Sequence, residues 1–259
     1  MELNKPLFEA VKVTKSFGGL LALRELTFGV KHNQLKALIG PNGAGKTTFF
    51  NLVTAVYSAD RGEIRFRGSI LNGLPTHQIV SLGITRTFQN PHIFRNLSVI
   101  ENVMVARHSQ TRCGIFHSLF HTPRMRREEN EIRKKSWSIL EFAGLEKWAY
   151  DSPTILPFGR QRRLEIARAL ATNPQLLLMD EPAAGLNLPE TEALGDFILK
   201  IRNQGISVLL IEHAMDLVME IADEIVVLNY GEKIAEGTPQ EIQNHPAVIA
   251  AYLGEETDA

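Results

Sequence analysis

The sequence predicts an α/β protein built around a mostly parallel sheet. Three short apolar runs, Leu35–Ile39, Leu176–Met179 and Ile206–Ile211, have the length and composition of parallel strands that are buried on both faces. Helical patterns lie between such runs, and Pro189–Arg202 shows the clearest apolar face. Because strands that alternate with helices pair in parallel, ligands are expected beyond the carboxyl ends of the strands.

Size and composition fit one folded α/β domain with an inserted lobe: the chain has 259 residues, of which 44% are hydrophobic. A formal net charge of −1 gives no general attraction to nucleic acid or anionic lipid, so we expect no nucleic-acid partner. The single cysteine, Cys113, excludes an internal disulfide framework and agrees with a reducing compartment. The first residues lack a signal-peptide pattern and no run reaches 18 apolar residues, so we expect the chain to act from outside any bilayer.

The first segment, Phe8–Val30, predicts strands of a half-exposed antiparallel layer, because apolar residues alternate on both sides of Gly18-Gly19. Phe17 ends the first half of this pattern. Its aromatic face would offer a purine ring a flat apolar partner, but phenylalanine is also an ordinary core residue. Taken alone, Phe17 leaves both interpretations open.

A glycine-rich loop follows the first apolar strand and leads into a helical pattern that continues from Thr48. Its eight residues, Gly40-Pro41-Asn42-Gly43-Ala44-Gly45-Lys46-Thr47, fit the pattern G-x-x-x-x-G-K-[ST]. Glycines let successive backbone N–H groups point at phosphate oxygens, and the helix N-terminus adds partial positive charge. Lys46 is expected to neutralise β- and γ-phosphate oxygens, and the Thr47 hydroxyl to ligate Mg²⁺. The loop therefore predicts a nucleotide site.

The segment after the loop predicts two further strands with a helix between them. Arg61–Gly68 alternates as a strand, and Pro75–Leu82 has a proline at its start and a glycine at its end, as helices do. Ile84–Phe88 then forms a strand that leads into Gln89. The amide oxygen of Gln89 can reach a metal ion or a water, although a glutamine is more commonly solvated or locally bonded.

Residues 91 to 155 are predicted to form a helical lobe that interrupts the alternation of strands and helices. Ser98 and Glu101 form a capping box for one helix, and Thr122-Pro123 begins another. The segment Leu156–Arg163 runs into Leu164–Leu170, a predicted helix that Asn173-Pro174 stops. Near the end of the chain, Thr238-Pro239-Gln240-Glu241 predicts a second capping box.

Two carboxylates and a histidine follow the later apolar strands. Asp180 and Glu181 come directly after Leu176–Met179; the first is suited to hold the Mg²⁺ shell and the second to orient a water. Glu212 and His213 follow Ile206–Ile211. A lone histidine there would be structural more often than not, but the strand ends can bring it to one face with the glycine-rich loop and the carboxylates.

Together these motifs, in this order and spacing, resemble an ATP-binding-cassette ATPase over essentially the whole chain. The resemblance implies a RecA-like P-loop NTPase core at 1–90 and 156–259, with the helical lobe at 91–155. It implies that Phe17 stacks on adenine and that Glu181 acts on the attacking water. The implied ATP-binding residues are Phe17, Gly40, Pro41, Asn42, Gly43, Ala44, Gly45, Lys46, Thr47 and Thr48; the implied Mg²⁺ residues are Thr47, Gln89 and Asp180; the implied catalytic residues are Lys46, Gln89, Glu181 and His213.

The family's signature segment corresponds to Leu156-Pro157-Phe158-Gly159-Arg160-Gln161. Here the usual Leu-Ser-Gly-Gly-Gln is altered, so the serine hydroxyl and one glycine are gone. In a head-to-tail pair of cassettes this segment faces the partner's nucleotide. We therefore expect the chain to hold a partner's nucleotide less strongly than its own.

A narrower resemblance is to the ATPases of branched-chain amino acid importers, the LivG type. It rests on Arg86-Thr87-Phe88-Gln89, Glu101-Asn102-Val103, Ala183-Ala184-Gly185-Leu186-Asn187 and Tyr252-Leu253-Gly254. This resemblance implies hydrolysis of Mg·ATP coupled to import, at the cytoplasmic face of the inner membrane. It implies two permease subunits, a second cassette that is a paralogue or a copy of this chain, and indirectly a periplasmic binding protein.

Three alternatives remain at this point. The chain could serve a different transporter, for another amino acid, an amide or export. It could be a soluble cassette ATPase that acts on ribosomes or DNA, although such proteins usually carry tandem cassettes or a long coiled coil. A P-loop kinase or GTPase is disfavoured, because no Asn-Lys-x-Asp motif follows the loop.

Overall fold

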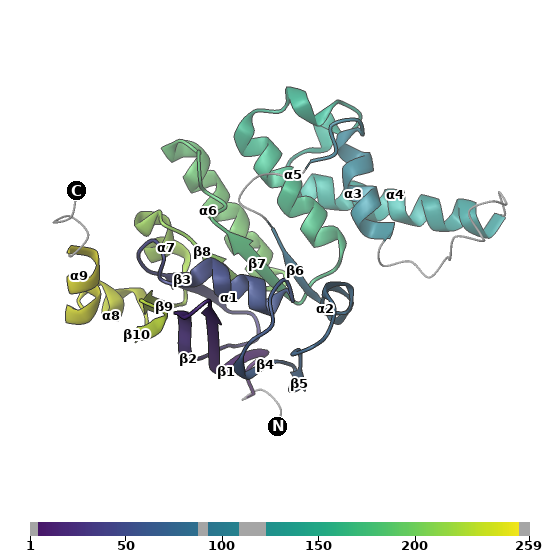
Figure 1. Ribbon diagram of the computed structural model, residues 1–259. Helices are drawn as coiled ribbons and strands as arrows, with labels where there is room; N and C mark the ends of the chain where they lie inside the picture. The colour runs from purple at the N-terminus through teal and green to yellow at the C-terminus, as the bar shows by residue number, and fades with distance from the viewer. Residues whose placement is uncertain (1–4, 88–92, 109–122, 254–259) are drawn as a thin grey trace. The chain divides into compact units, whose positions relative to one another are not determined.

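The computed structural model describes residues 5–87, 93–108 and 123–253 (Figure 1). Its contacts divide the chain into two compact units. Unit 1 consists of Met1–Arg86 and Gln175–Ala259, and unit 2 of Thr87–Pro174.

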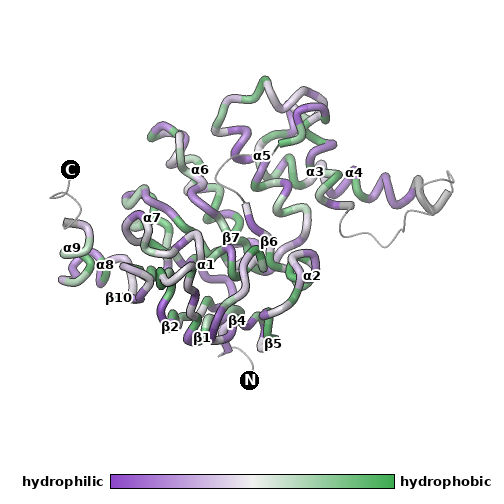
Figure 2. Tube along the Cα trace, in the orientation of Figure 1, coloured by the Kyte–Doolittle hydropathy of each residue, from purple (hydrophilic) through white to green (hydrophobic). Residues whose placement is uncertain are grey.

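The centre of unit 1 is a six-stranded sheet in the order β10-β9-β3-β8-β7-β6. Five strands are parallel, and β10 runs antiparallel to β9. The expected apolar strands are confirmed, and every residue of β3, β7 and β8 is buried. Figure 2 shows the hydrophobic character of these central strands. The strands are β3 (Leu35–Ile39), β6 (Ile84–Arg86), β7 (Leu176–Asp180), β8 (Ser207–Ile211), β9 (Glu224–Asn229) and β10 (Glu232–Gly237).

A second, antiparallel sheet of four strands, in the order β2-β1-β4-β5, confirms the predicted antiparallel flank. Its apolar face packs on the helix that follows the glycine-rich loop, where the ring of Phe49 lies 5.1 Å from that of Phe28 and 6.2 Å from that of Phe8. One buried cluster therefore joins both sheets through this helix. The strands are β1 (Phe8–Phe17), β2 (Leu20–Val30), β4 (Arg61–Phe66) and β5 (Ser69–Ile70).

Several helices of unit 1 begin or end at cap residues that the sequence carries. Asn187 and Glu190 form a capping box at α6, and Thr238 and Glu241 form the predicted one at α8. Gly83 has φ +104° and ends α2 in the left-handed conformation that glycine adopts without strain. The helices are α1 (Lys46–Val53), α2 (Thr76–Leu82), α6 (Leu188–Asn203), α7 (Met215–Ile221), α8 (Pro239–Gln243) and α9 (Pro246–Leu253).

Unit 2 is helical, and the predicted capping box of Ser98 and Glu101 opens its first helix. Three helices, α3 (Val99–His108), α4 (Pro123–Ala143) and α5 (Phe158–Ala171), contact one another. Two short 3₁₀ turns, η2 (Glu146–Trp148) and η3 (Pro153–Ile155), join α4 to α5.

The boundary of the helical unit differs from the expected lobe of 91–155. The sequence analysis placed the segment from residue 156 in the core, whereas α5 belongs to unit 2, because its apolar face packs on α3 and α4. The helix begins at Phe158, directly after the signature's proline.

Candidate active site

The glycine-rich loop lies between β3 and α1, as predicted, and its glycines are required by space as well as by conformation. Gly40 has φ +146°, and a Cβ there would lie 2.1 Å from the carbonyl oxygen of Leu228. Gly45, with φ +103°, caps α1, and a Cβ there would lie 2.6 Å from the carbonyl oxygen of Ala22. Any larger residue at either position would push the loop away from its neighbours.

Lys46 is the first residue of α1 and is only 5% exposed. Its Nζ donates hydrogen bonds to the carbonyl oxygens of Gly40, at 2.6 Å, and of Pro41, at 2.9 Å. The ammonium group is thus held inside the loop that it belongs to. Phosphate oxygens carry more negative charge than these carbonyl groups and would bind the ammonium more strongly.

The turn between β9 and β10 holds the loop from the other end of the sequence. The N–H of Gly231 donates to the carbonyl oxygen of Ala44 at 3.1 Å, and the carbonyl oxygen of Gly231 accepts the N–H of Arg24 at 2.9 Å. A Cβ at Gly231 would lie 2.7 Å from the carbonyl oxygen of Ala22. The sequence analysis did not predict this contact, because it joins residues 187 positions apart in the chain.

A cavity of about 360 Å³ lies over this loop in unit 1. It brings together residues that were predicted from four separate stretches of sequence: the end of β1, the loop with the start of α1, and the segments after β7 and β8. Tyr230, which is 87% exposed, also lines it. The predicted site residues in its lining are Phe17, Asn42, Gly43, Ala44, Gly45, Lys46, Thr47, Thr48, Glu181 and His213.

Glu181 and His213 meet at this cavity although they follow different strands. Their side chains touch, with His213 Nε2 and Glu181 Oε1 3.0 Å apart. The N–H of Glu181 donates to the carbonyl oxygen of Ile211 at 2.8 Å, which ties the two segments together. Glu181 also has φ +46°, a conformation that is unfavourable for a residue with a side chain and that surrounding contacts must maintain.

Asp180 ends β7 and is buried beside Arg86, whose Nη2 lies 2.6 Å from its Oδ2. The second terminal nitrogen of Arg86, Nη1, donates to Oδ1 of Asn51 at 2.7 Å. This pair connects β7, β6 and α1. The sequence analysis named Arg86 only as part of a motif and gave it no role of its own.

The residues expected to hold Mg²⁺ fit that ion by chemistry. Asp180 and Leu38 both pair with Ile211 in the sheet, so Asp180 lies at the edge from which the loop departs. Carboxylate and hydroxyl oxygens are the hard donors that Mg²⁺ prefers, and Thr47 lines the cavity. Among the described residues, no group of three or more His, Cys, Asp and Glu side chains could hold a metal ion.

Phe17 is 40% exposed and lines the cavity, so the alternative that it is a core residue is wrong. Its ring lies 5.1 Å from that of Tyr57, edge to face, and Nζ of Lys15 lies 5.2 Å from its centre. Asp60 holds this strand end, accepting hydrogen bonds from Lys15 Nζ at 2.8 Å and from the Ser16 N–H at 2.7 Å. These bonds lower the pKa of Asp60 from 3.8 to about 2.

The signature segment lies in unit 2 and forms the start of α5. Pro157 is the N-cap, and in the described chain its side chain makes no capping hydrogen bond. Its carbonyl oxygen accepts the N–H groups of Arg160, at 2.9 Å, and Gln161, at 3.0 Å. Phe158 is 41% exposed, and the guanidinium of Arg160 lies 4.0 Å from the centre of the Trp148 ring. Gln161 Nε2 donates to the carbonyl oxygen of Leu156 at 2.9 Å.

Gln89 lies outside the described residues, and so does Cys113. Gly40 and Pro41 are in the loop, but the cavity lining includes neither; both accept hydrogen bonds from Lys46. No helix in the described part of the chain is long and apolar enough to cross a membrane.

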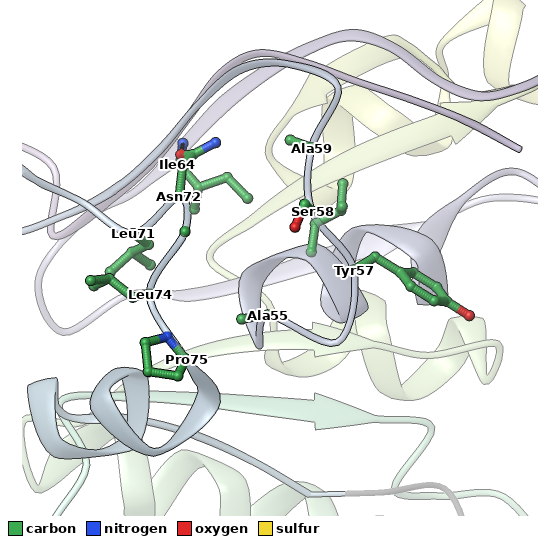
Figure 3. Close-up of a pocket in the computed structure, with 11 residues that line it drawn as sticks. Ala55, Tyr57, Ser58, Ala59, Ile64, Leu71, Asn72, Leu74 and Pro75 are labelled. Carbon is green, nitrogen blue, oxygen red and sulfur yellow. Dashed lines mark hydrogen bonds between the residues drawn. The ribbon is translucent and has the colours of Figure 1, made fainter.

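A second cavity in unit 1, of about 290 Å³, lies where the end of α1 faces the segment before α2 (Figure 3). In Figure 3 the side chain of Tyr57 points away from Leu71, Leu74 and Pro75. The residues that line this cavity are uncharged, so it offers a phosphate group no cation. They are Leu52, Ala55, Tyr57, Ser58, Ala59, Ile64, Leu71, Asn72, Gly73, Leu74 and Pro75.

Comparison with known proteins places the chain among transporter ATPases. Residues 23–184 match the family described as ABC transporter, and residues 232–258 match the one described as branched-chain amino acid ATP-binding cassette transporter. The chain is 46% identical over 254 residues to the high-affinity branched-chain amino acid transport ATP-binding protein BraF of Pseudomonas aeruginosa. It is equally similar to LivG of Escherichia coli. Each alignment covers 98% of this chain and 100% of the relative.

Solved structures agree with the sequence comparison. The ADP conformation of MJ1267, an ATP-binding cassette of an ABC transporter, has a TM-score of 0.84 and 30% identity, covering 97% of this chain and all of that one. A dimeric bacterial ABC transporter cassette, MJ0796, has a TM-score of 0.75 and 25% identity, covering 90% of this chain and 98% of that one. Similarity of this extent and over both sequence and structure shows that the chain belongs to the family of ABC transporter ATP-binding cassettes, which are nucleotide-binding ATPases.

Proposed function

We propose that this chain is the ATP-hydrolysing subunit of an importer for branched-chain amino acids. The observation that carries the proposal is the single cavity that contains the glycine-rich loop together with Glu181 and His213. The substrate class is supported by the match of residues 232–258 and by the full-length relatives, whose names state branched-chain amino acid transport.

Nucleotide binding is assigned to the loop and to the start of α1. The loop amides and the Lys46 ammonium bind the β- and γ-phosphates, and Phe17 lies under the base at the rim of the cavity. Thr47 and Asp180 would hold Mg²⁺, which when bound supplies positive charge to the phosphate oxygens. Arg86 fixes the Asp180 carboxylate in place, because its Nη2 lies 2.6 Å from the carboxylate oxygen Oδ2.

The hydrolytic step is assigned to Glu181 and His213. The Glu181 carboxylate orients the attacking water and accepts its proton. This requires the carboxylate oxygen to be held in one place beside the γ-phosphate. His213 Nε2 lies 3.0 Å from that carboxylate and holds it from the side of β8. The role assigned to the His213 side chain is to sense the γ-phosphate. From sequence alone, Gln89 is assigned the role of sensing the γ-phosphate.

The proposed assembly contains two cassettes and two permease subunits. Two cassettes close head to tail, so that the α5 start of each chain meets the nucleotide of the other, and the second cassette is a paralogue or a copy of this chain. The helical unit docks on two permease subunits at the cytoplasmic face of the inner membrane. A periplasmic binding protein delivers the amino acid and does not touch this chain.

The proposal is tested by transport in reconstituted vesicles. The chain is combined with the permeases and the second cassette from neighbouring reading frames and with their binding protein. We expect ATP-dependent uptake of leucine, isoleucine and valine, and no uptake of glutamate as a polar control. ATP hydrolysis without uptake of any of the three would refute the substrate class, and absent hydrolysis would refute the site.

A further inference from the structure

Glu212, which directly precedes His213, is a buried carboxylate with an unusual set of partners. It follows β8 and is only 3% exposed. Its Oε1 accepts the N–H of Ala183 at 2.6 Å. Its Oε2 accepts the N–H of His213 at 2.8 Å and that of Ala214 at 3.2 Å. One side chain therefore takes three backbone hydrogen bonds from two different segments.

These two segments are the ones that carry the candidate water-orienting pair. Ala183 lies two residues after Glu181, in the segment that follows β7, whereas His213 and Ala214 follow β8. The Glu181 and His213 side chains are 3.0 Å apart only if both segments keep their places. Glu212 joins the segments through both carboxylate oxygens, so its reach sets the separation between them.

Because Glu212 is buried, its carboxylate depends on these hydrogen bonds. A buried carboxylate is strongly unfavourable unless several donors satisfy it, and N–H groups that face a carboxylate make stronger hydrogen bonds than those between neutral groups. A glutamine of the same shape would place an NH₂ group against at least one of these N–H donors, because an amide accepts at only one end. The site therefore distinguishes a glutamate from its amide although the two have the same size.

The backbone of Glu181 needs such support. Its φ of +46° is unfavourable for a residue with a side chain and persists only where several contacts fix it. One contact is the hydrogen bond from its N–H to Ile211, and the Glu212 bond to Ala183 holds the segment on the other side of the residue. The strained residue is thus fixed from both directions by the end of β8.

We infer that Glu212 is a positioning residue that sets the distance between Glu181 and His213, an inference that rests on the roles proposed above for those two residues. Glu212 itself touches neither the nucleotide nor the attacking water in this assignment. It acts through the backbone of the two segments. Its loss should therefore slow hydrolysis while leaving ATP binding intact.

The test compares Glu212→Gln and Glu212→Asp with Ser207→Ala in the assembled transporter. Ser207 is a matched control, because it lies at the opposite end of β8, is fully buried, and accepts the N–H of Asn33 at 2.8 Å. We expect kcat to fall about tenfold or more in Glu212→Gln, with KM and ATP affinity within about threefold of the wild type. Glu212→Asp keeps the charge but is too short to reach both segments, so it should also lose activity. Wild-type kcat in either variant would overturn the inference.

A double-mutant cycle separates positioning from general destabilisation. If Glu212 acts by setting the distance between Glu181 and His213, then Glu212→Gln should lower kcat by less than about twofold in a His213→Ala background. A full further tenfold loss there would overturn the inference, because it would mean that Glu212 acts independently of the pair. Ser207→Ala should lower the melting temperature without changing kcat in either background.

Amide hydrogen exchange gives a reading that does not depend on turnover. In Glu212→Gln, exchange should accelerate at Ala183 and at His213 or Ala214, and Ser207→Ala should leave those amides unchanged. If His213→Ala hydrolyses ATP like the wild type, the role proposed for His213 fails, while accelerated exchange would still support the bridge. Unchanged exchange at both segments would overturn the bridge itself.

Discussion

The helices α1 and α5 both begin with backbone N–H groups in segments assigned to phosphate binding, but their surroundings differ. The start of α1 is enclosed by the glycine-rich loop, by the buried Lys46 ammonium and by a turn from the far end of the chain. The start of α5 has an N-cap proline, an exposed Phe158 and an arginine stacked on Trp148. In unit 1 the sequence retains every group that a phosphate needs, whereas in unit 2 it retains only the helix start and a neighbouring charge.

This difference predicts two unequal nucleotide sites if the second cassette is a paralogue with an intact signature. The chain's own loop would then work opposite a full signature, and its altered signature would serve the partner's weaker site. The chain's own glycine-rich loop is the strong half of this contrast, and its altered signature is the weak half.

Glu181→Gln tests the strong half. The amide keeps the shape but cannot accept the proton of the attacking water, so we expect ATP hydrolysis to fall by a factor of about 10²–10⁴ while Mg·ATP still binds and closed dimers accumulate. Glu190→Gln is the control, because a glutamine can replace the glutamate of its capping box. Undiminished hydrolysis in Glu181→Gln would remove Glu181 from the mechanism. An equal loss of transport on changing the matching carboxylate of the partner would contradict the asymmetry.

Arg86→Met tests how the strong half is held. It leaves the Asp180 carboxylate buried without its cation, and we expect the free energy of unfolding to fall by about 3–5 kcal/mol. Arg202→Met is matched, since Arg202 also lies 2.6 Å from an aspartate, Asp223, but at an exposed site, where about 1 kcal/mol or less is expected. Denaturant unfolding measures both. Equal losses of unfolding free energy in the two variants would mean that burial of the Arg86–Asp180 pair does not increase its contribution to stability.

Pro157→Ser tests the weak half. A serine at the N-cap of α5 restores a hydroxyl toward the partner's nucleotide, a charge-assisted hydrogen bond of about 1.5–3 kcal/mol, so nucleotide trapping at that site should strengthen about tenfold or more. Pro75→Ser is the control, because Pro75 is likewise an N-cap proline, at α2. Both changes should improve helix capping, but only the first should change trapping. Unchanged trapping in Pro157→Ser would contradict the signature assignment.

Arg160→Gln also tests the weak half, the altered signature. The guanidinium is held against Trp148 at 4.0 Å, and Arg160 is the charged residue within the altered signature segment. If it compensates for the missing hydroxyl, its removal should abolish the residual trapping at the partner's site. Trapping that survives the change would assign Arg160 a packing role only.

Phe17→Ala tests the adenine end of the strong half, with an expected loss of ATP affinity of about 1–3 kcal/mol. Because the ring is 40% exposed, the melting temperature should change little. Tyr57→Ala is the control, since Tyr57 touches the Phe17 ring without lining the cavity over the glycine-rich loop. A lower melting temperature with unchanged ATP affinity would contradict stacking on adenine.

The smallest expected effect is a pH dependence at Asp60. Its folded pKa of about 2 lies below the unfolded value of 3.8, so the stability that it contributes is present above pH 3.8 and is lost as the pH falls through about 2. Asp60→Asn should therefore differ from the wild type in thermal melting at pH 5 and converge with it near pH 2. A constant difference across this range would mean that ionisation of Asp60 does not matter.

The sequence predicted best those parts in which a few neighbouring residues carry the whole signal. Leu35–Ile39 followed by the glycine-rich loop, and the capping boxes at Ser98 and Thr238, depend on contacts between residues at most a few positions apart. Hence their places were predicted to within a residue or two. The short helix α7 and the strand β10 were missed, because neither has a long enough apolar pattern.

The positioning residues could not be predicted in this way. Glu212 follows an apolar strand just as a solvated residue would, and only the hydrogen bond to Ala183, 29 positions away, gives it a role. Arg86 similarly depends on Asp180, 94 positions later. Contacts of long sequence separation thus account for what local patterns omit.

The strand order of the central sheet has a consequence for the newly made chain. β3 lies between β9 and β8, and both of these neighbours come from residues beyond 206. While the ribosome is still producing the middle of the protein, both edges of this apolar strand lack their partners, and the loop that follows lacks the turn at Gly231. An apolar strand with two open edges readily pairs with other chains. Folding of the nucleotide site must therefore wait for nearly the whole chain, and truncated or stalled products should aggregate instead of forming a partly active ATPase.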